Sequence, residues 1–419
     1  MIKNQHEVVP IAKILRVVCI AVIGAVVFSF LLSCAGTSVQ APGEKPGTDS
    51  SDSIALPKNW FFTPEQFGNA PVPVTAGDRG MKEVFPGAQG FGIYTKAGRG
   101  GQVLRVTNLA SSGAGSLREA LETSGPRIVI FEKGGIIDLK MKGLTVVDPY
   151  LTVAGQTAPL PGITIIRGNL LVATHDVLVQ HIAIRAGDGG DMKRQGWEPD
   201  CLSAAGSNSY NVVFDHCSVS WGIDEGASIS GDRTLGPMKT TRFATISNCI
   251  IAENLSLSTH SKGEHSKGSL IHDFCQYIAV IGNLYAHNRD RNPYFKAFCL
   301  GIAANNFLYN PGQNAIRLDY VDSEWIGASM KPENGRVSVV GNVMQRGADT
   351  KQGLVLITGR GDLFQKDNSY FPAPPREATA VNIALGRFTE LAKPAVWPEG
   401  FVAQDSAAVR DHVLANAGM

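Results

Sequence analysis

The most constraining feature of the sequence is a short pattern that recurs between residues 177 and 343. Each copy has apolar residues four and two places before a polar turn residue, and an apolar residue or a thiol one place after it. The turn residues are His181, His216, Asn248, Asn283, Asn306 and Asn342. The exception among the flanking positions is Ser338, in the last copy. Alternate inward side chains before a polar corner are typical of one coil of a parallel β-helix.

One such coil cannot bury its inner face alone, so successive coils must stack to form a continuous core. Parallel crossover connections wind right-handed. The sequence therefore predicts an all-β chain with a single right-handed parallel β-helix domain, in which loop insertions form a substrate groove. The 46 glycines among 419 residues agree with many short strands joined by turns. A formal charge of +1 gives no broad basic surface, so we expect no nucleic-acid partner.

The corner residues are predicted to stack along the axis of the β-helix. Asparagines in one column can hydrogen-bond to one another as a ladder. His181 and His216 occupy that column, so we interpret them as ladder residues rather than catalytic ones. Cys217 and Cys249 fall in the inward column and are assigned to the core. No C-x-x-C spacing occurs, which favours buried thiols over a zinc site.

The N-terminus has the pattern of a targeting segment. Lys13 and Arg16 precede an apolar run that ends in Leu-Leu-Ser-Cys34, which resembles a bacterial lipobox, although a plain signal peptide is the alternative. The predicted division is a signal at 1–33, a tether at 34–78, a β-helix catalytic domain at 79–370 and a tail at 371–419 packed on the helix. The expected location is the cell envelope, as an outer-membrane lipoprotein or a secreted protein.

Three insertions between coils, at 185–200, 252–272 and 287–300, are expected to build the groove, and charged residues gather in and between them. The acidic residues are Glu198, Asp200, Asp224 and Glu225, and a cationic run extends from Arg289 to Lys296. Carboxylates at one end and fixed cations at the other predict a metal ion and an anionic ligand sharing one site.

The second insertion also carries His260 and His265, five residues apart. Imidazoles at such spacing leave a transition-metal site open, but we favour an exposed loop at the edge of the groove.

These residues resemble the pectate lyase family of right-handed β-helix polysaccharide lyases, over about Phe85 to Gly359. The motifs that carry the resemblance are Phe85–Gly92, Arg99-Gly100-Gly101, Gly115–Arg118, Gly155-Gln156-Thr157, Asp200–Ser203, Val213–Trp221 and Arg291-Asn292-Pro293. The resemblance implies a calcium-dependent enzyme that acts on an anionic plant cell-wall polysaccharide. We also expect a monomer, which would contact the membrane only through the N-terminal lipid that the lipobox pattern at Cys34 predicts.

The resemblance also implies roles for individual residues. It makes Glu198, Asp200 and Asp224 calcium ligands, while Ser228 stands where a further acidic ligand is expected, so that Glu225 or substrate oxygens would compensate. Arg291 corresponds to the catalytic arginine.

Three lysines are implied substrate-binding residues. Lys296 replaces an arginine expected to bind substrate, which keeps the charge but loses bidentate geometry. Either Lys267 or Lys262 would clamp the substrate.

The implied reaction is β-elimination of α-1,4-polygalacturonate to 4,5-unsaturated oligogalacturonides. A base removes the proton alpha to the uronate carboxylate, and the oxygen at C4 leaves. Ca²⁺ suits oxygen ligands and stabilises developing negative charge. Because guanidinium holds its proton tightly, neighbouring cations would have to lower the pKa of Arg291, which predicts an alkaline optimum.

Two alternatives stay open from the sequence. A glycoside hydrolase on the same fold would use Asp200, Asp224 and Glu225 as acid and base and leave Arg291 dispensable. A non-catalytic surface glycan-binding lipoprotein is the other, and Ser228 and Lys296 are the residues that favour it.

Overall fold

The computed structural model describes residues 59–67, 82–191, 196–371 and 383–418. All of them belong to one compact unit, Pro57–Met419. The predicted signal and the first part of the predicted tether lie outside the described residues. Within the described part of the chain, no helix is long and apolar enough to span a membrane.

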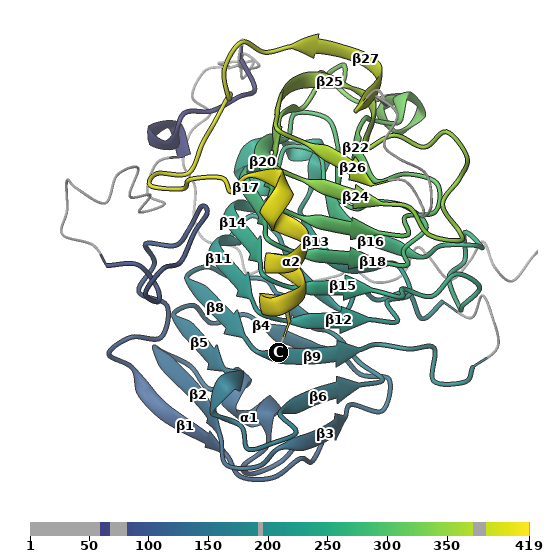
Figure 1. The fold of residues 1–419 in the computed structure, drawn as a ribbon. Coiled ribbons are helices and arrows are strands. Elements are labelled where there is room, and N and C mark those ends of the chain that lie inside the picture. The colour runs from purple at the N-terminus through teal and green to yellow at the C-terminus, as the bar shows by residue number, and fades with distance from the viewer. Residues whose placement is uncertain (1–58, 68–81, 192–195, 372–382, 419) are drawn as a thin grey trace, which may run out of the picture. The chain divides into compact units, whose positions relative to one another are not determined.

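The strands form three parallel columns, each built from one strand of every coil (Figure 1). The first column contains β1 (Gln102–Val106), β2 (Arg127–Phe131), β5 (Leu151–Ala154), β8 (Val177–Gln180), β11 (Tyr210–Asp215), β14 (Arg242–Ser247), β17 (Gln276–Ile281), β20 (Leu300–Ala304) and β23 (Arg336–Val340). The second contains β3 (Gly135–Asp138), β6 (Ile163–Ile166), β9 (Ile182–Arg185), β12 (Ser218–Ser220), β15 (Ile250–Ala252), β18 (Leu284–Ala286), β21 (Phe307–Tyr309), β24 (Val343–Gln345) and β26 (Ser369–Phe371). The third contains β4 (Leu144–Val146), β7 (Leu170–Val172), β10 (Leu202–Ala205), β13 (Glu225–Ser230), β16 (Lys267–Ile271), β19 (Tyr294–Phe295), β22 (Ile316–Leu318), β25 (Ile357–Lys366) and β27 (Ala384–Glu390).

The core lies inside the coils, where side chains from all three columns meet. Each strand is too short to bury its inner face alone, so the stack supplies the hydrophobic burial. All five cysteines that were expected to be buried thiols are buried and free, and Cys217 and Cys249 belong to the central core as predicted.

At the corner between the first and second columns, the observed alignment of the turn residues differs from the predicted one. Strand pairing places Asp215 beside Gln180 and Ser247, and Ile281 beside Ser247. The next residue of each coil therefore forms one column of left-handed backbone, with φ near +50° to +70°. That column contains His181, His216, Asn248, Gly282, Asn305 and Gly341. The predicted alignment is right for the first three coils and wrong by one residue for Asn283, Asn306 and Asn342.

This shift also explains the outlying Ser338. In the true register Val337 and Val339 point into the core. Ser338 instead pairs with Ile302, whose side chain packs outside the coil with Phe401. The apparent break in the pattern thus came from the misaligned register.

The asparagine ladder is confirmed one position further along the corner. Asn283 Nδ2 donates to Asn306 Oδ1 at 2.9 Å, and Asn306 Nδ2 donates to Asn342 Oδ1 at 2.9 Å. Asn368 adds a rung that the sequence pattern missed, accepting from Asn342 Nδ2 at 3.1 Å. Because these amides are buried, the ladder satisfies polar groups that would otherwise destabilise the core.

The two corner histidines stack on each other, with ring centroids 5.0 Å apart. His216 is held by Asp215, whose Oδ2 lies 2.7 Å from its Nδ1. This arrangement agrees with a structural role for both rings.

Helices cover one end and one side of the unit. α1 (Leu117–Glu122) is capped by Ser116 and packs apolar residues into the core beside β4. α2 (Ser406–Asn416) buries Val409 and Val413 against β21 and β24. Within the predicted tail, β27 adds a parallel strand to β25.

Candidate active site

Carboxylates meet at the N-terminal ends of two neighbouring strands of the third column, β10 and β13. Asp200 lies two residues before β10 and Glu225 begins β13, and the parallel register of these strands sets Asp200 beside Glu225. The Glu225 N–H donates to Asp200 Oδ1 at 3.0 Å. Carboxylate oxygens of Asp200, Asp224 and Glu225 lie within 4.8 Å of one another. The structure thus brings together three of the four predicted acidic ligands.

These carboxylates line a groove with a volume of about 250 Å³. Its charged residues are the carboxylates Asp200, Asp224, Glu225 and Glu324 and the cations Lys262, Arg291 and Lys296. A larger cavity of about 520 Å³ lies beside Arg289, but its charged residues do not include this acidic cluster. The chemistry therefore points to the smaller groove as the active site.

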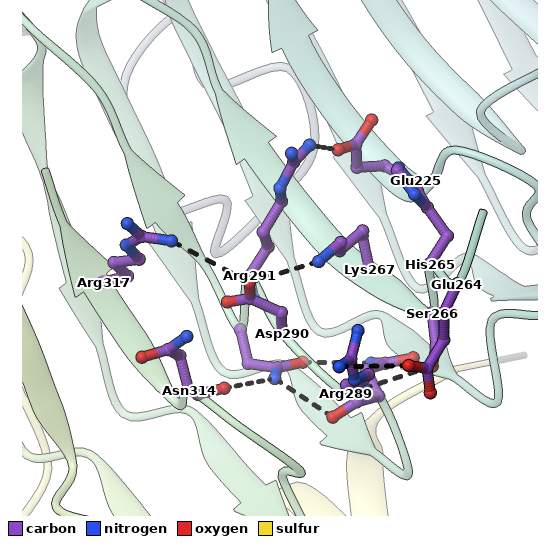
Figure 2. Close-up of polar contacts among 12 residues, drawn as sticks. Glu225, Glu264, His265, Ser266, Lys267, Arg289, Asp290, Arg291, Asn314 and Arg317 are labelled. Atoms are coloured by element: carbon purple, nitrogen blue, oxygen red, sulfur yellow. Dashed lines mark hydrogen bonds and ion pairs between the residues drawn. The ribbon is translucent and has the colours of Figure 1, made fainter. Parts of the chain in front are cut away.

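Arg291 is delivered to the acidic cluster by the segment that precedes β19. The bridge between Lys267 and Asp290 sets this segment level with the start of β16. From there the Arg291 guanidinium forms an ion pair with Glu225, as Figure 2 shows. Its backbone has φ near +61°, and its side chain is 22 % exposed. The predicted juxtaposition of the acidic and cationic segments is confirmed here.

Burial and neighbouring charge separate the pKa values of the two central acids. Burial, together with the nearby Asp224 carboxylate, raises the pKa of Asp200 to about 7. Burial also favours the neutral form of Asp224, but the hydrogen bond and charge of His265 outweigh it, so the pKa of Asp224 is lowered. Burial lowers the pKa of Arg291, against the opposing effect of Asp224. A less basic guanidinium is what a proton-accepting arginine needs.

The acidic cluster fits a calcium ion. Carboxylate oxygens are the hard ligands that Ca²⁺ prefers. Burial and, after it, the charge of Asp224 raise the pKa of Asp200, so both disfavour full ionisation of the cluster, and a bound divalent cation would offset both effects. Asp200, Asp224 and Glu225 would hold the ion, with Ser228 at the position where a further acid was expected.

Glu198 lies at the edge of this cluster, against the insertion after β15. Its Oε1 accepts a hydrogen bond from the Ser261 N–H at 2.5 Å, and the side chain of Ser261, followed by this backbone contact, lowers the pKa of Glu198. His260 Nε2 lies 3.6 Å from its Oε2.

The interpretation of His260 and His265 as part of an exposed loop is wrong, because both rings are buried. Their stacking and their contacts with Asp224 remove them from solvent.

The three predicted substrate-binding lysines are placed differently. Lys262 lines the groove. Lys267 is buried, and its ammonium pairs with Asp290 at 3.2 Å (Figure 2). Lys296 lines the groove but is held by Asp273 at 3.2 Å and by Glu324. The structure therefore favours Lys262 over Lys267 as the residue available to an anionic ligand.

Glu324 also lines the groove, and no pattern in the sequence predicted it there. It lies in the short 3₁₀ helix Asp322–Trp325, well after the cationic run. It forms ion pairs with both Lys296 and Arg233. Its position in the groove depends on tertiary contacts with residues that are distant in sequence, so a local sequence motif could not have identified it.

Comparison with known proteins found no matching family model. The chain is 38% identical over 267 residues to "Probable pectate lyase C" of Aspergillus flavus, covering 64% of this chain and 55% of that protein. It is 41% identical over 229 residues to the protein of the same name from Emericella nidulans, covering 54% of this chain and 48% of that protein. The chain thus spans about half the length of the curated relatives it matches.

Solved structures share the fold. The cedar pollen allergen jun a 1 matches with a TM-score of 0.55 and 16% identity, over 83% of this chain and 99% of that chain. A pectate lyase bound to a hexasaccharide matches with a TM-score of 0.55 and 13% identity, over 81% and 98%. The prediction of an all-β, right-handed parallel β-helix is confirmed.

Proposed function

We propose that this protein is a pectate lyase that cleaves α-1,4-polygalacturonate by β-elimination, with Ca²⁺ as cofactor. The observation that carries the proposal is the placement of Arg291 against the carboxylates of the groove, whose lining it shares with Asp200, Asp224 and Glu225. The similarity to proteins named probable pectate lyase C supports it. So does the structural likeness to a pectate lyase bound to a hexasaccharide.

The residues of the groove have defined tasks in this reaction. Lys262 and Lys296 attract and orient the uronate carboxylate. Arg291, in its neutral form, accepts the proton from the carbon alpha to that carboxylate. The C–H electrons form the double bond to C4, and the C4–O bond breaks to release the leaving chain. Bound calcium would stabilise the negative charge that develops on the substrate carboxylate.

Substitution of Arg291 tests this assignment. Arg291→Ala should reduce formation of unsaturated product from polygalacturonate at least about a hundredfold, as expected for loss of a general base. Arg289→Ala is the matched control, because Arg289 pairs with Glu264 outside the groove lining and should leave the rate nearly unchanged. Equal activity of the Arg291→Ala variant and the wild-type protein would refute the role of Arg291.

Hydrolysis of a glycan is a second candidate function, favoured by the two central acids. Asp200 has a pKa of about 7, whereas the pKa of Asp224 is lowered. Such a separation is the pattern of a general acid beside an ionised partner. New reducing ends without unsaturated product, lost in Asp200→Asn but kept in Arg291→Ala, would support hydrolysis.

We also propose export with lipid attachment at Cys34, from the sequence pattern alone. The curated relatives are fungal, so this part draws no support from them. Metabolic labelling with a radioactive fatty acid in a bacterial host should mark the wild-type protein and not Cys34→Ala. Equal labelling of both would exclude Cys34 as the attachment site.

A further inference from the structure

The insertion between β15 and β16 brings two buried histidines to the acidic cluster. His260 has no exposed surface and His265 is 4 % exposed. Their rings stack with centroids 3.7 Å apart and an interplanar angle of 14°. Burying two imidazoles next to carboxylates costs solvation unless the rings make favourable polar contacts.

Both imidazoles converge on one oxygen of Asp224. His265 Nε2 lies 2.6 Å from Asp224 Oδ1, a short hydrogen bond. His260 Nε2 lies 3.4 Å from the same oxygen and 3.6 Å from Glu198 Oε2. The adjacent Ser261 N–H donates to the other oxygen of Glu198. One short segment therefore contacts two of the predicted calcium ligands.

The backbone fixes the tautomer of His260. The Lys262 N–H donates to His260 Nδ1 at 3.0 Å, so Nδ1 carries the lone pair. In the neutral ring the proton then resides on Nε2, which has no hydrogen-bond partner among the described residues. That proton lies between the carboxylates of Asp224 and Glu198 and attracts both.

This tautomer argues against a transition-metal site made by the two histidines. A metal would need the Nε2 lone pair, while Nδ1 is already used as an acceptor. The nearly parallel, stacked rings also cannot both direct in-plane lone pairs at one ion. The geometry instead makes the pair donors to carboxylates.

We propose that His260 and His265 are positioning residues that hold Asp224 and Glu198 in place for a divalent cation in the groove. This inference rests on the proposed calcium-dependent function. His265 holds Oδ1 of Asp224 by a short hydrogen bond, and the Nε2–H of His260 faces the same oxygen at 3.4 Å, so the two rings together restrict rotation of this carboxylate. Loss of such supporting contacts typically weakens metal binding about 10- to 100-fold.

Titration calorimetry of the full chain with CaCl₂ tests the proposal without relying on activity. His265→Ala should raise the calcium dissociation constant about tenfold or more, and His265→Gln, which keeps an N–H donor, should recover part of the loss. His287→Ala is the control, because its ring is exposed and lies outside the cluster. Excess calcium should restore the rate at which the His265→Ala variant forms unsaturated product. A variant impaired only in packing would not recover in this way.

The outcomes separate the two proposals. Calcium binding by the wild-type protein with unchanged affinity in His265→Ala and His260→Ala would overturn the positioning role and leave the proposed function intact. Tight ZnCl₂ binding that both substitutions abolish, with unchanged calcium affinity, would overturn it in favour of a metal site. Absence of calcium binding by the wild-type protein would overturn both.

Discussion

Arg291 forms an ion pair with Glu225 by reaching across β16 to the first residue of β13. The pair joins the third insertion to the acidic cluster, so the proposed base and the proposed metal ligands form one connected unit. Asp200 and Asp224 complete that unit at the same edge of the third column. A change in the charge of one of these residues is therefore expected to shift the pKa values of the others.

Asp200 predicts how stability and metal binding depend on pH. Its pKa of about 7 is raised above the usual range by burial and by Asp224, so the folded metal-free protein favours the protonated form. The stability from this preference is complete below the unfolded pKa and is lost as pH rises through about 7. The melting temperature in chelator should fall between about pH 4 and 7 more steeply in wild type than in Asp200→Asn.

Calcium should oppose this trend, because the ion needs the ionised carboxylate. Below pH 7 its apparent affinity should rise about tenfold for each pH unit. Parallel melting curves for wild type and Asp200→Asn in chelator across this range would contradict the assignment.

Substitution of Lys262, which lines the groove, and of Lys267, the first residue of β16, should have different effects. Lys262→Ala should raise the KM for polygalacturonate about tenfold, as expected for loss of a charge-assisted contact, with little change in stability. Lys267→Ala should instead destabilise the fold by about 1–3 kcal/mol, because it removes the closer of the two cations that pair with the buried Asp290 and leaves only Arg317, at 3.9 Å. Steady-state kinetics combined with thermal melting distinguishes them, and the reverse pattern would identify Lys267 as the clamp.

Glu324 is expected to weaken the attraction of the groove for uronate. Its carboxylate pairs with Lys296, which Asp273 also holds at 3.2 Å, so Glu324 is one of two carboxylates that compete with the uronate for this cation. Glu324→Gln should lower the KM for polygalacturonate about two- to fivefold, the range of a partly exposed ion pair, and should affect a highly methyl-esterified pectin less. An increased KM would show that Glu324 helps to orient Lys296 rather than to neutralise it.

The asparagine ladder predicts a graded effect on stability. Asn306 is fully buried and bonds to both Asn283 and Asn342. Asn306→Ala should destabilise the protein by about 2–4 kcal/mol, because it leaves buried polar groups without partners. Asn368→Ala, at the half-buried last rung, is the control and should cost less. Equal losses in melting temperature would argue against a continuous ladder.

The fold was predictable because the repeat is periodic. The one-residue error in the predicted alignment has a physical cause. Asn248 and Asn283 look equivalent in sequence, yet the first holds the left-handed turn position and the second the buried ladder position. Both positions favour Asn, one because Asn tolerates positive φ and the other because its amide can bridge coils. Sequence spacing could not decide between them, since Gly282 takes over the turn.

The site was predictable where residues lie at strand starts and not where loops fold back. Asp200 and Glu225 fall at equivalent points of adjacent coils, so stacking alone brings them together. His260 and Glu324 reach the groove through insertions whose paths no periodicity defines. Burial of His260 depended on contacts with Asp224 and Glu198 that are distant in sequence.

The most direct test of the proposed reaction compares two products from the same digest of polygalacturonate. Ultraviolet absorbance counts new double bonds, and a reducing-sugar assay counts new chain ends. β-Elimination predicts one double bond for each new reducing end, with both signals lost in chelator. New reducing ends without ultraviolet absorbance would contradict the account and identify a hydrolase.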